Sequence, residues 1–267
     1  MYEPVKARLL LEEASVGREQ GFSAATRLEP EASPAGVPAM RIVGITAIAL
    51  AVSMVIQNAM FMATDAPGYG DPIEEVFAWH RENRTVVAIA VAQEALHIPL
   101  LLGFLTGLHG LVAGHGGATW SRLAVAAGAT LSAIFALYSV LWIGVALSVG
   151  EHTEPNPTFE LAWLLHAAAF ALALPALGAT FIGAALAAHQ SRLTPSWQRL
   201  LGVAGGSLLL AAGAASLEIA DGSPLLFVGL PGLALWIVWL LATGVRLVRA
   251  RTTARPDTAS TADATRG

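Results

Sequence analysis

Six long stretches that contain a single carboxylate between them constrain the fold of this chain more than any other feature. They cover residues 42–64, 85–108, 123–150, 161–188, 200–217 and 222–245. A helix with a rise of 1.5 Å per residue needs about 20 apolar residues to cross a hydrocarbon core roughly 30 Å thick. Only helices and closed barrels satisfy their backbone groups in lipid, and these stretches are too long for barrel strands.

The sequence therefore predicts an all-α membrane protein, a bundle of six transmembrane helices within residues 40–250. The predicted spans are about 41–63, 85–109, 122–149, 159–188, 198–218 and 224–249. Residues 1–39 end in a segment rich in Pro, Ala, Glu and Ser and are expected to form a flexible cytoplasmic tail. Residues 251–267 are expected to form a disordered cytoplasmic tail.

Composition agrees with this class and excludes several functions. Charged residues make up 13% of the chain, against about 25% in soluble domains. The absence of cysteine excludes disulfides, thiolate metal sites and thiol catalysis. A net charge of −4 gives no reason to expect a nucleic-acid partner, so the expected surroundings are the lipid bilayer. One lysine against fourteen arginines favours a bacterial source.

The basic residues predict the orientation. With both termini inside, only Arg81 and Arg84 fall in outer loops, and this is a strong positive-inside bias. The basic residues placed inside are Lys6, Arg8, Arg18, Arg27, Arg41, Arg122, Arg192, Arg199, Arg246, Arg249, Arg251, Arg255 and Arg266. The expected location is the cytoplasmic (inner) membrane of a bacterium, with both termini cytoplasmic.

The first outer loop is predicted to carry a short interfacial helix. Asp71 at the N-cap, Pro72 at the first position and Glu74 at the third are typical of a helix start. Phe77 and Trp79 give this helix an apolar side that would lie at the membrane surface or cap the bundle. His80 is expected to be a solvated loop residue.

Polar side chains at membrane depth form the candidate site. Glu94 lies about 15 Å from the outer end of its span, and His97 shares its helix face at i, i+3. An ionisable group at this depth is costly, so it is expected to face the bundle interior and to have a partner. The candidates for ligand or proton binding are Glu94, His97, Gln57, Tyr138, His166 and Trp142. Glu160 and Glu218 are expected at the rim of a pocket that opens outward.

Three functions fit this pattern. The first is binding or transport of a small solute, linked to protonation of Glu94, without enzymatic activity. The second is a haem- or metal-binding redox protein in which His97 and His166 are ligands, although no cofactor is required by the pattern. The third is a non-catalytic membrane assembly partner, in which the polar cluster only fixes helix packing.

Small residues indicate where helices approach closely. Gly103 and Gly107, Ala179 and Gly183, and Gly202 and Gly206 each lie four residues apart on one helix face. Packing within the chain is the first interpretation of these faces, and a homo-oligomer contact is the second.

Overall fold

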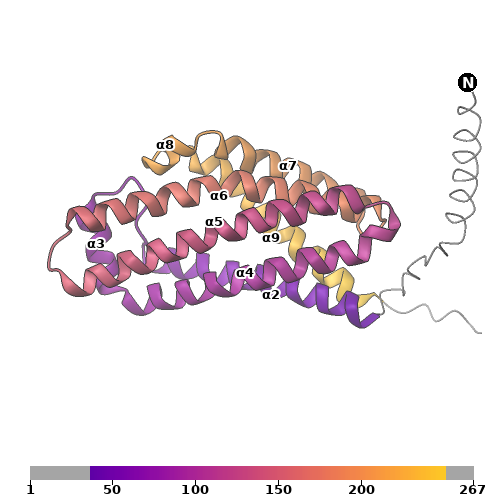
Figure 1. The fold of residues 1–267 in the computed structure, drawn as a ribbon, viewed down its shortest axis with the longest axis horizontal. Helices are drawn as coiled ribbons and strands as arrows, with labels where there is room; N and C mark the ends of the chain where they lie inside the picture. The colour runs from indigo at the N-terminus through magenta and orange to yellow at the C-terminus, as the bar shows by residue number, and fades with distance from the viewer. Residues whose placement is uncertain (1–36, 251–267) are drawn as a thin grey trace, which may run out of the picture. The chain divides into compact units, whose positions relative to one another are not determined.

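The computed structural model describes residues 37–250, and the described part is all helical, which confirms the all-α prediction. The helices are α2 (Val37–Ala63), α3 (Ile73–Glu82), α4 (Arg84–Val112), the 3-10 helix η1 (Ala113–His115), α5 (Ala118–Glu151), α6 (Pro157–Gln190), α7 (Ser196–Gly213), α8 (Ser216–Ala220) and α9 (Leu226–Arg249). Figure 1 shows the long helices running side by side. The tails predicted for 1–39 and 251–267 lie outside the described residues, except for 37–39, which begin α2.

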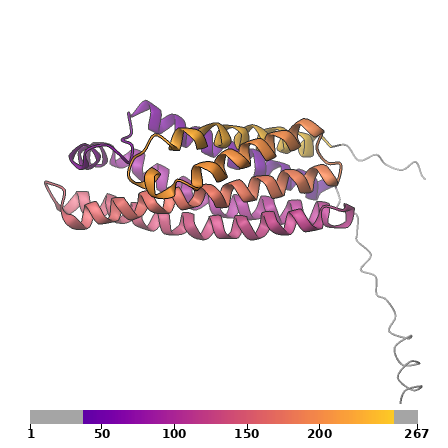
Figure 2. The same ribbon diagram turned by 90° about the horizontal axis from the view of Figure 1, so that it is seen from above.

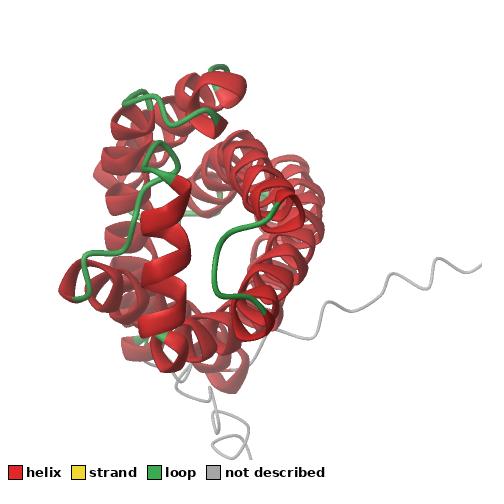
Figure 3. Cartoon of the chain, turned by 90° about the vertical axis from the view of Figure 1, so that its left-hand side faces the viewer, coloured by secondary structure: helices red, strands yellow, loops and turns green. Residues whose placement is uncertain are grey.

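Six helices form a closed ring. The neighbouring pairs are α2 with α4, α4 with α5, α5 with α6, α6 with α7, α7 with α9, and α9 with α2. Figure 3 views this ring from the end at which α3 lies, and Figure 2 shows the same helices from above. Contacts such as Val43 with Gly107 and Leu105 with Gly128 show that neighbours run antiparallel. The last helix of the ring, α9, packs against the first, α2, and this contact closes the ring.

Five of the helices are long and apolar enough to cross a membrane, so the membrane prediction holds for five of the six stretches. They are α2, α4, α5, α6 and α9. Their outward faces carry large apolar side chains such as Ile45, Leu96, Leu147 and Leu172. This is the surface expected of a protein whose solvent is lipid.

The fifth predicted span, 198–218, differs from the observed helices. Its residues divide between α7 and the short α8, and α7 is not among the five membrane-length apolar helices. The polar first turn of α7, with Gln198 and Arg199, lowers its hydropathy. At the other end of α7, the Ser216 hydroxyl donates to the Gly213 carbonyl at 2.5 Å and lies 3.4 Å from the Ala171 carbonyl as a second, weaker acceptor. Pro175 frees that carbonyl inside α6 because it has no N–H to donate.

Glycines allow neighbouring backbones to touch where α6 packs on α7 and where α9 packs on α2. A Cβ on Gly206 would lie 2.7 Å from the Gly178 carbonyl oxygen of α6, and a Cβ on Gly44 would lie 2.7 Å from the Gly244 oxygen of α9. The predicted packing within the chain is thus confirmed at Gly206. Gly202, Gly183 and Gly107 likewise face neighbouring helices of the same chain. At Gly103, by contrast, an added Cβ would meet no atom within 4 Å.

A short helix, α3, lies between α2 and α4 in the segment for which an interfacial helix was predicted, but its start differs from the prediction. Pro72 takes the N-cap position without a side-chain hydrogen bond. Asp71 instead accepts a 2.7 Å hydrogen bond from the Gly68 backbone N–H through its Oδ2, so it tightens the preceding turn. Val76 and Phe77 are buried, and α3 packs on the ends of α4 and α5. The helix therefore closes one end of the ring.

Candidate functional site

A cavity of about 360 Å³ lies inside the ring. Its walls come from α2, α4, α5, α6 and α9, and the loop before α3 and α3 itself cover one end. All six predicted candidates line it: Gln57, Glu94, His97, Tyr138, Trp142 and His166. The two predicted rim residues do not line it, because Glu160 and Glu218 are exposed, the first near the start of α6 and the second in α8. The six predicted candidates thus lie around one cavity, and Glu160 and Glu218 lie outside its lining.

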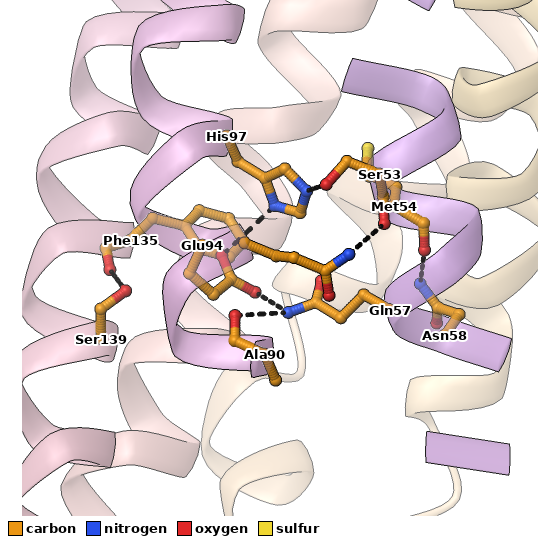
Figure 4. Close-up of polar contacts among 10 residues, drawn as sticks. Ser53, Met54, Gln57, Asn58, Ala90, Glu94, His97, Phe135 and Ser139 are labelled. Atoms are coloured by element: carbon orange, nitrogen blue, oxygen red, sulfur yellow. Dashed lines mark hydrogen bonds and ion pairs between the residues drawn. The ribbon is translucent and has the colours of Figure 1, made fainter. Parts of the chain in front are cut away.

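Glu94 lies on the cavity wall and is only 4% exposed. Figure 4 shows Gln57 of α2 reaching across to it, and Gln57 Nε2 donates a 2.8 Å hydrogen bond to Glu94 Oε1. The second oxygen, Oε2, is buried and has no hydrogen-bond partner among residues 37–250. Its nearest cationic candidate is His97 Nδ1 at 3.6 Å, which is longer than a hydrogen bond. The carboxylate is therefore half satisfied by hydrogen bonds, and its second oxygen lies buried at ion-pair distance from His97.

The spacing of polar residues on α2 and α4 explains how this pair forms. Ser53 and Gln57 are one turn apart on α2, as are Gln93 and His97 on α4. In an antiparallel pair these turns meet: His97 Nε2 lies 2.9 Å from the Ser53 hydroxyl, and Gln93 Nε2 donates to the Ser53 carbonyl at 3.5 Å. Polar contacts at both turns fix the register of α2 against α4.

Aromatic rings surround His166 at the end of the cavity near α3. The imidazole stacks on Tyr138 with ring centroids 3.9 Å apart and on Trp163 at 5.3 Å. His166 Nδ1 lies 3.2 Å from the Tyr138 carbonyl oxygen. Tyr69, from the loop before α3, packs against Trp163 and His166 at 5.3 and 6.0 Å. The faces of His166 are thus covered by aromatic rings.

The position of Tyr69 depends on a close contact between two loops. Gly222, between α8 and α9, has a φ of 85°, which glycine adopts without strain. A Cβ on Gly222 would lie 2.5 Å from the Gly70 backbone nitrogen. Burial of the Tyr69 hydroxyl raises its pKa well above the usual 10, and the nearby Glu94 charge adds to this rise. Tyr69 therefore shares the environment of Glu94.

The prediction that His80 is solvated is wrong. The side chain lies in α3, is 2% exposed and lines the cavity. Trp142 Nε1–H donates to His80 Nε2 at 3.1 Å, so Nδ1 carries the hydrogen and donates to the Val76 carbonyl at 2.8 Å. Both ring nitrogens are used by a neutral imidazole, and burial lowers the pKa of His80 below its ordinary 6.5. Val76 and Phe77 lie four and three residues before His80 and therefore on the same face of α3. This apolar face was the signal in the sequence that could have predicted the burial of His80.

We expect the protein to lose stability on acidification because of His80. The folded state holds the imidazole neutral, whereas the unfolded chain takes up a proton near pH 6.5, so stability is complete above that pH and falls below it. The slope is up to about 1.4 kcal/mol per pH unit until the folded pKa is reached. Melting temperatures of the wild type at pH 8 and pH 5.5 measure the loss. The matched variant is His80→Gln, which keeps an acceptor for Trp142 but does not titrate. An equal loss in the variant would contradict this role.

The charged groups of the cavity are few. Glu94 is the one Asp or Glu among the lining residues, and no Lys or Arg joins it there. Within residues 37–250, no group of three or more His, Asp or Glu side chains is arranged to hold a metal ion. The lining residues beyond the polar cluster are mostly apolar, including Leu101, Leu177 and Trp236. The site is an apolar cavity with one carboxylate on its wall.

No protein-family model matches this chain, and no curated protein or solved structure is significantly similar to it. The functional argument therefore depends on the geometry of the site.

Proposed function

We propose that this protein binds a small amphipathic solute in its central cavity, in the course of moving it across or sensing it in a membrane. The observation that carries the proposal is Glu94 Oε2, a buried oxygen without a partner on the wall of a cavity of about 360 Å³. A buried polar group without a partner is costly, and such groups mark functional sites in membrane proteins. Ligand pockets are typically apolar and contain a few well-placed polar groups.

Protonation of Glu94 is the second part of the proposal. A protonated carboxylic acid is less costly in an apolar cavity than a carboxylate, so an arriving or departing ligand changes which form is favoured. The titratable groups that line the cavity with Glu94 are His97 of α4, Tyr69 of the loop before α3, His80 of α3, Tyr138 of α5 and His166 of α6. The cavity-lining residues of α2 and α9 include no titratable side chain. Glu94 is therefore the one acid whose charge a ligand in this cavity would control.

For location, we propose the cytoplasmic membrane of a bacterium, with six spans and both ends of the helical domain inside. α7 lies between α6 and α9 in the ring, and Leu200 and Leu210 on it are exposed like the lipid-facing residues of the other helices. Its 18 residues reach about 27 Å. Arg41 near the start of α2 and Arg249 at the end of α9 fall at the same end of the ring, as the positive-inside rule requires for cytoplasmic ends.

A reporter that is active only in the cytoplasm tests this orientation. It is expected to work when fused after Arg122 and after Arg249, and to fail when inserted in the loop at residues 66–70. Activity in the 66–70 loop would reverse the topology. Activity after Arg122 combined with failure after Arg249 would instead reduce the span count to five.

Solute binding is tested on the full chain in lipid nanodiscs. A variant that fills the cavity, Ala173→Leu, removes space among the lining residues, whereas Ala136→Leu makes the same change on an exposed face of α5. If the cavity binds solutes, a ligand that raises the melting temperature of the wild type will do the same for Ala136→Leu and not for Ala173→Leu. Equal shifts in all three proteins would show that the ligand acts through the lipid, and would contradict the cavity as binding site.

A further inference from the structure

We infer, building on the proposed function, that the solute is an organic monocation: a protonated amine attached to an aromatic or aliphatic body. The juxtaposition that carries this inference is an unpaired carboxylate oxygen, a set of aromatic rings and an apolar wall within one cavity.

The carboxylate selects for charge and for a hydrogen-bond donor. Gln57 occupies Glu94 Oε1, and Oε2 accepts no hydrogen bond from residues 37–250, its nearest donor candidate being His97 at ion-pair distance. His97 does not supply one, because its Nδ1 is 3.6 Å away and its Nε2 is held by Ser53. An ammonium group brings both an N–H donor and a positive charge, and charge-assisted hydrogen bonds are about twice as strong as neutral ones. The missing partner of Glu94 is therefore one that an amine ligand supplies.

The aromatic residues favour the same ligand class. Phe61 lies one turn from Gln57 on α2 and packs against Trp142 with centroids 5.7 Å apart. Tyr138 and Trp142 are neighbours on α5 at 5.8 Å, and all three rings line the cavity. The faces of Trp, Tyr and Phe attract cations through the negative charge of their π-systems, more strongly where water is excluded. A cation bound in this cavity would thus share it with rings that attract positive charge.

The far part of the cavity defines the rest of the ligand. Its wall is formed by Leu101, Leu131, Leu174, Leu177, Leu233 and Trp236. Side chains of this kind gain free energy by covering apolar surface and cannot pair with hydroxyl or phosphate groups. The body of the ligand is therefore hydrocarbon or aromatic, and a polar body such as a sugar is excluded.

Anions and metal ions fit this cavity poorly. An anion would approach a carboxylate with no Lys or Arg on the walls to offset the repulsion, and His80 is held neutral by its two hydrogen bonds. A hydrated metal ion needs several oxygen or nitrogen ligands held together, and within residues 37–250 no group of three or more His, Asp or Glu side chains is arranged to supply them. The arrangement selects against both classes.

When Glu94 starts protonated, binding of the amine cation displaces the proton of its carboxylic acid. The acid gives up its O–H proton, the proton leaves to water, and the carboxylate pairs with the ammonium, so the charge within the cavity changes by zero. This balance makes the cation and the proton competitors for one oxygen. The exchange gives the proton linkage of the proposed function a chemical basis.

Three probes of nearly the same shape test the inference in nanodiscs: 2-phenylethylamine, which is a cation at neutral pH, 2-phenylethanol, a neutral hydrogen-bond donor, and phenylacetate, an anion. The amine is expected to raise the melting temperature of the wild type in a saturable manner, with an affinity at least about 10-fold above that of the alcohol. The anion is expected to give no shift. The melting-temperature shifts of Ala173→Leu and Ala136→Leu are measured in parallel. A shift that remains in Ala173→Leu comes from the effect of the probe on the lipid and is subtracted.

The outcomes separate the inference from the function on which it rests. If the alcohol or the anion binds as well as the amine and Ala173→Leu abolishes that binding, the cavity holds a solute but does not select cations, and the inference is overturned. If none of the three probes shifts the wild type, the proposed solute site is overturned with it. The hydrogen bonds of Glu94 then only hold α2 against α4.

Discussion

Glu94→Gln is expected to leave the protein folded and to remove most of its affinity for 2-phenylethylamine. The amide keeps the shape of the side chain and an oxygen that accepts from Gln57 Nε2, so we expect the melting temperature to change little. It removes the negative charge, and a hydrogen bond to a charged group contributes about 1.5–3 kcal/mol, which corresponds to a loss of roughly 10–100-fold in affinity. Titration of the purified variant in nanodiscs measures both quantities.

The matched control is Glu160→Gln, which makes the same chemical change at an exposed acid that does not line the cavity. It should bind the probe like the wild type. The pH dependence of binding gives a second readout, because only a titrating carboxylate makes amine binding release a proton. If Glu94→Gln binds the amine as tightly as the wild type, Glu94 has a packing role alone.

Gly206→Leu is expected to prevent the ring from closing. The backbones of α6 and α7 touch at this position, where even a Cβ would lie 2.7 Å from the Gly178 oxygen and 2.5 Å from Ile182 Cγ1. Because backbone atoms on the neighbouring helix cannot move aside independently, the helices must separate. Overpacking in a core costs about 1–3 kcal/mol, and more where backbone is displaced. We expect a strongly lowered melting temperature or loss of folded protein on size-exclusion chromatography.

Gly103→Leu serves as the control because it inserts the same side chain into another transmembrane helix, α4. No atom lies within 4 Å of a Cβ at this position, and the glycine is exposed. This variant should melt within a degree or two of the wild type. Equal damage from both substitutions would mean that an uninterrupted leucine face, and not the contact between α6 and α7, causes the loss. A stable Gly206→Leu protein would contradict the close approach itself.

The polar pair at Glu94 was within reach of sequence reasoning. Apolar stretches as long as these contain few polar side chains. A buried polar side chain on one stretch must therefore find its hydrogen-bond partner among the few polar side chains on the others. Gln57 and Glu94 were singled out because they lie at similar depth on helices that are adjacent in sequence. Consecutive spans cross a membrane in opposite directions, so residues at equal depth on two such helices meet where the helices pack together, and the 2.8 Å hydrogen bond is the result.

Tyr69 and His80 were missed because their burial is decided by tertiary packing. The loop that carries Tyr69 is rich in turn residues, which predict solvent exposure. Its path into the cavity depends on the contact between Gly70 and Gly222, which are 152 residues apart in the chain by their numbers and share no local pattern. His80 is buried because Trp142 offers it a hydrogen bond on a helix not adjacent to α3 in sequence. The pairing of the Tyr69 loop with a distant loop leaves no periodic signal, whereas His80 shares one helix face with Val76 and Phe77.

The predicted fifth span, 198–218, continues past the end of α7 for a related reason. Hydropathy alone joins 200–213 to 216–217, because all of these residues are uncharged. The break after Gly213 reflects contacts with α6: an added Cβ on Gly213 would press on Pro175, and Ser216 donates to the carbonyl that this proline frees. Pro175 in α6 thus helps to determine where the neighbouring helix α7 ends.

The contact of Gly44 with Gly244 has a consequence for biosynthesis. α2 is the first helix of the ring to leave the ribosome and α9 is the last, so the ring closes only when translation of the helical domain is complete. Glu94 meets Gln57 much earlier, as soon as α4 has been inserted beside α2. The polar pair therefore joins two helices that are made early, whereas the cavity is enclosed last. A nascent chain stalled before α9 would have Glu94 and Gln57 in place but would lack one wall of the cavity.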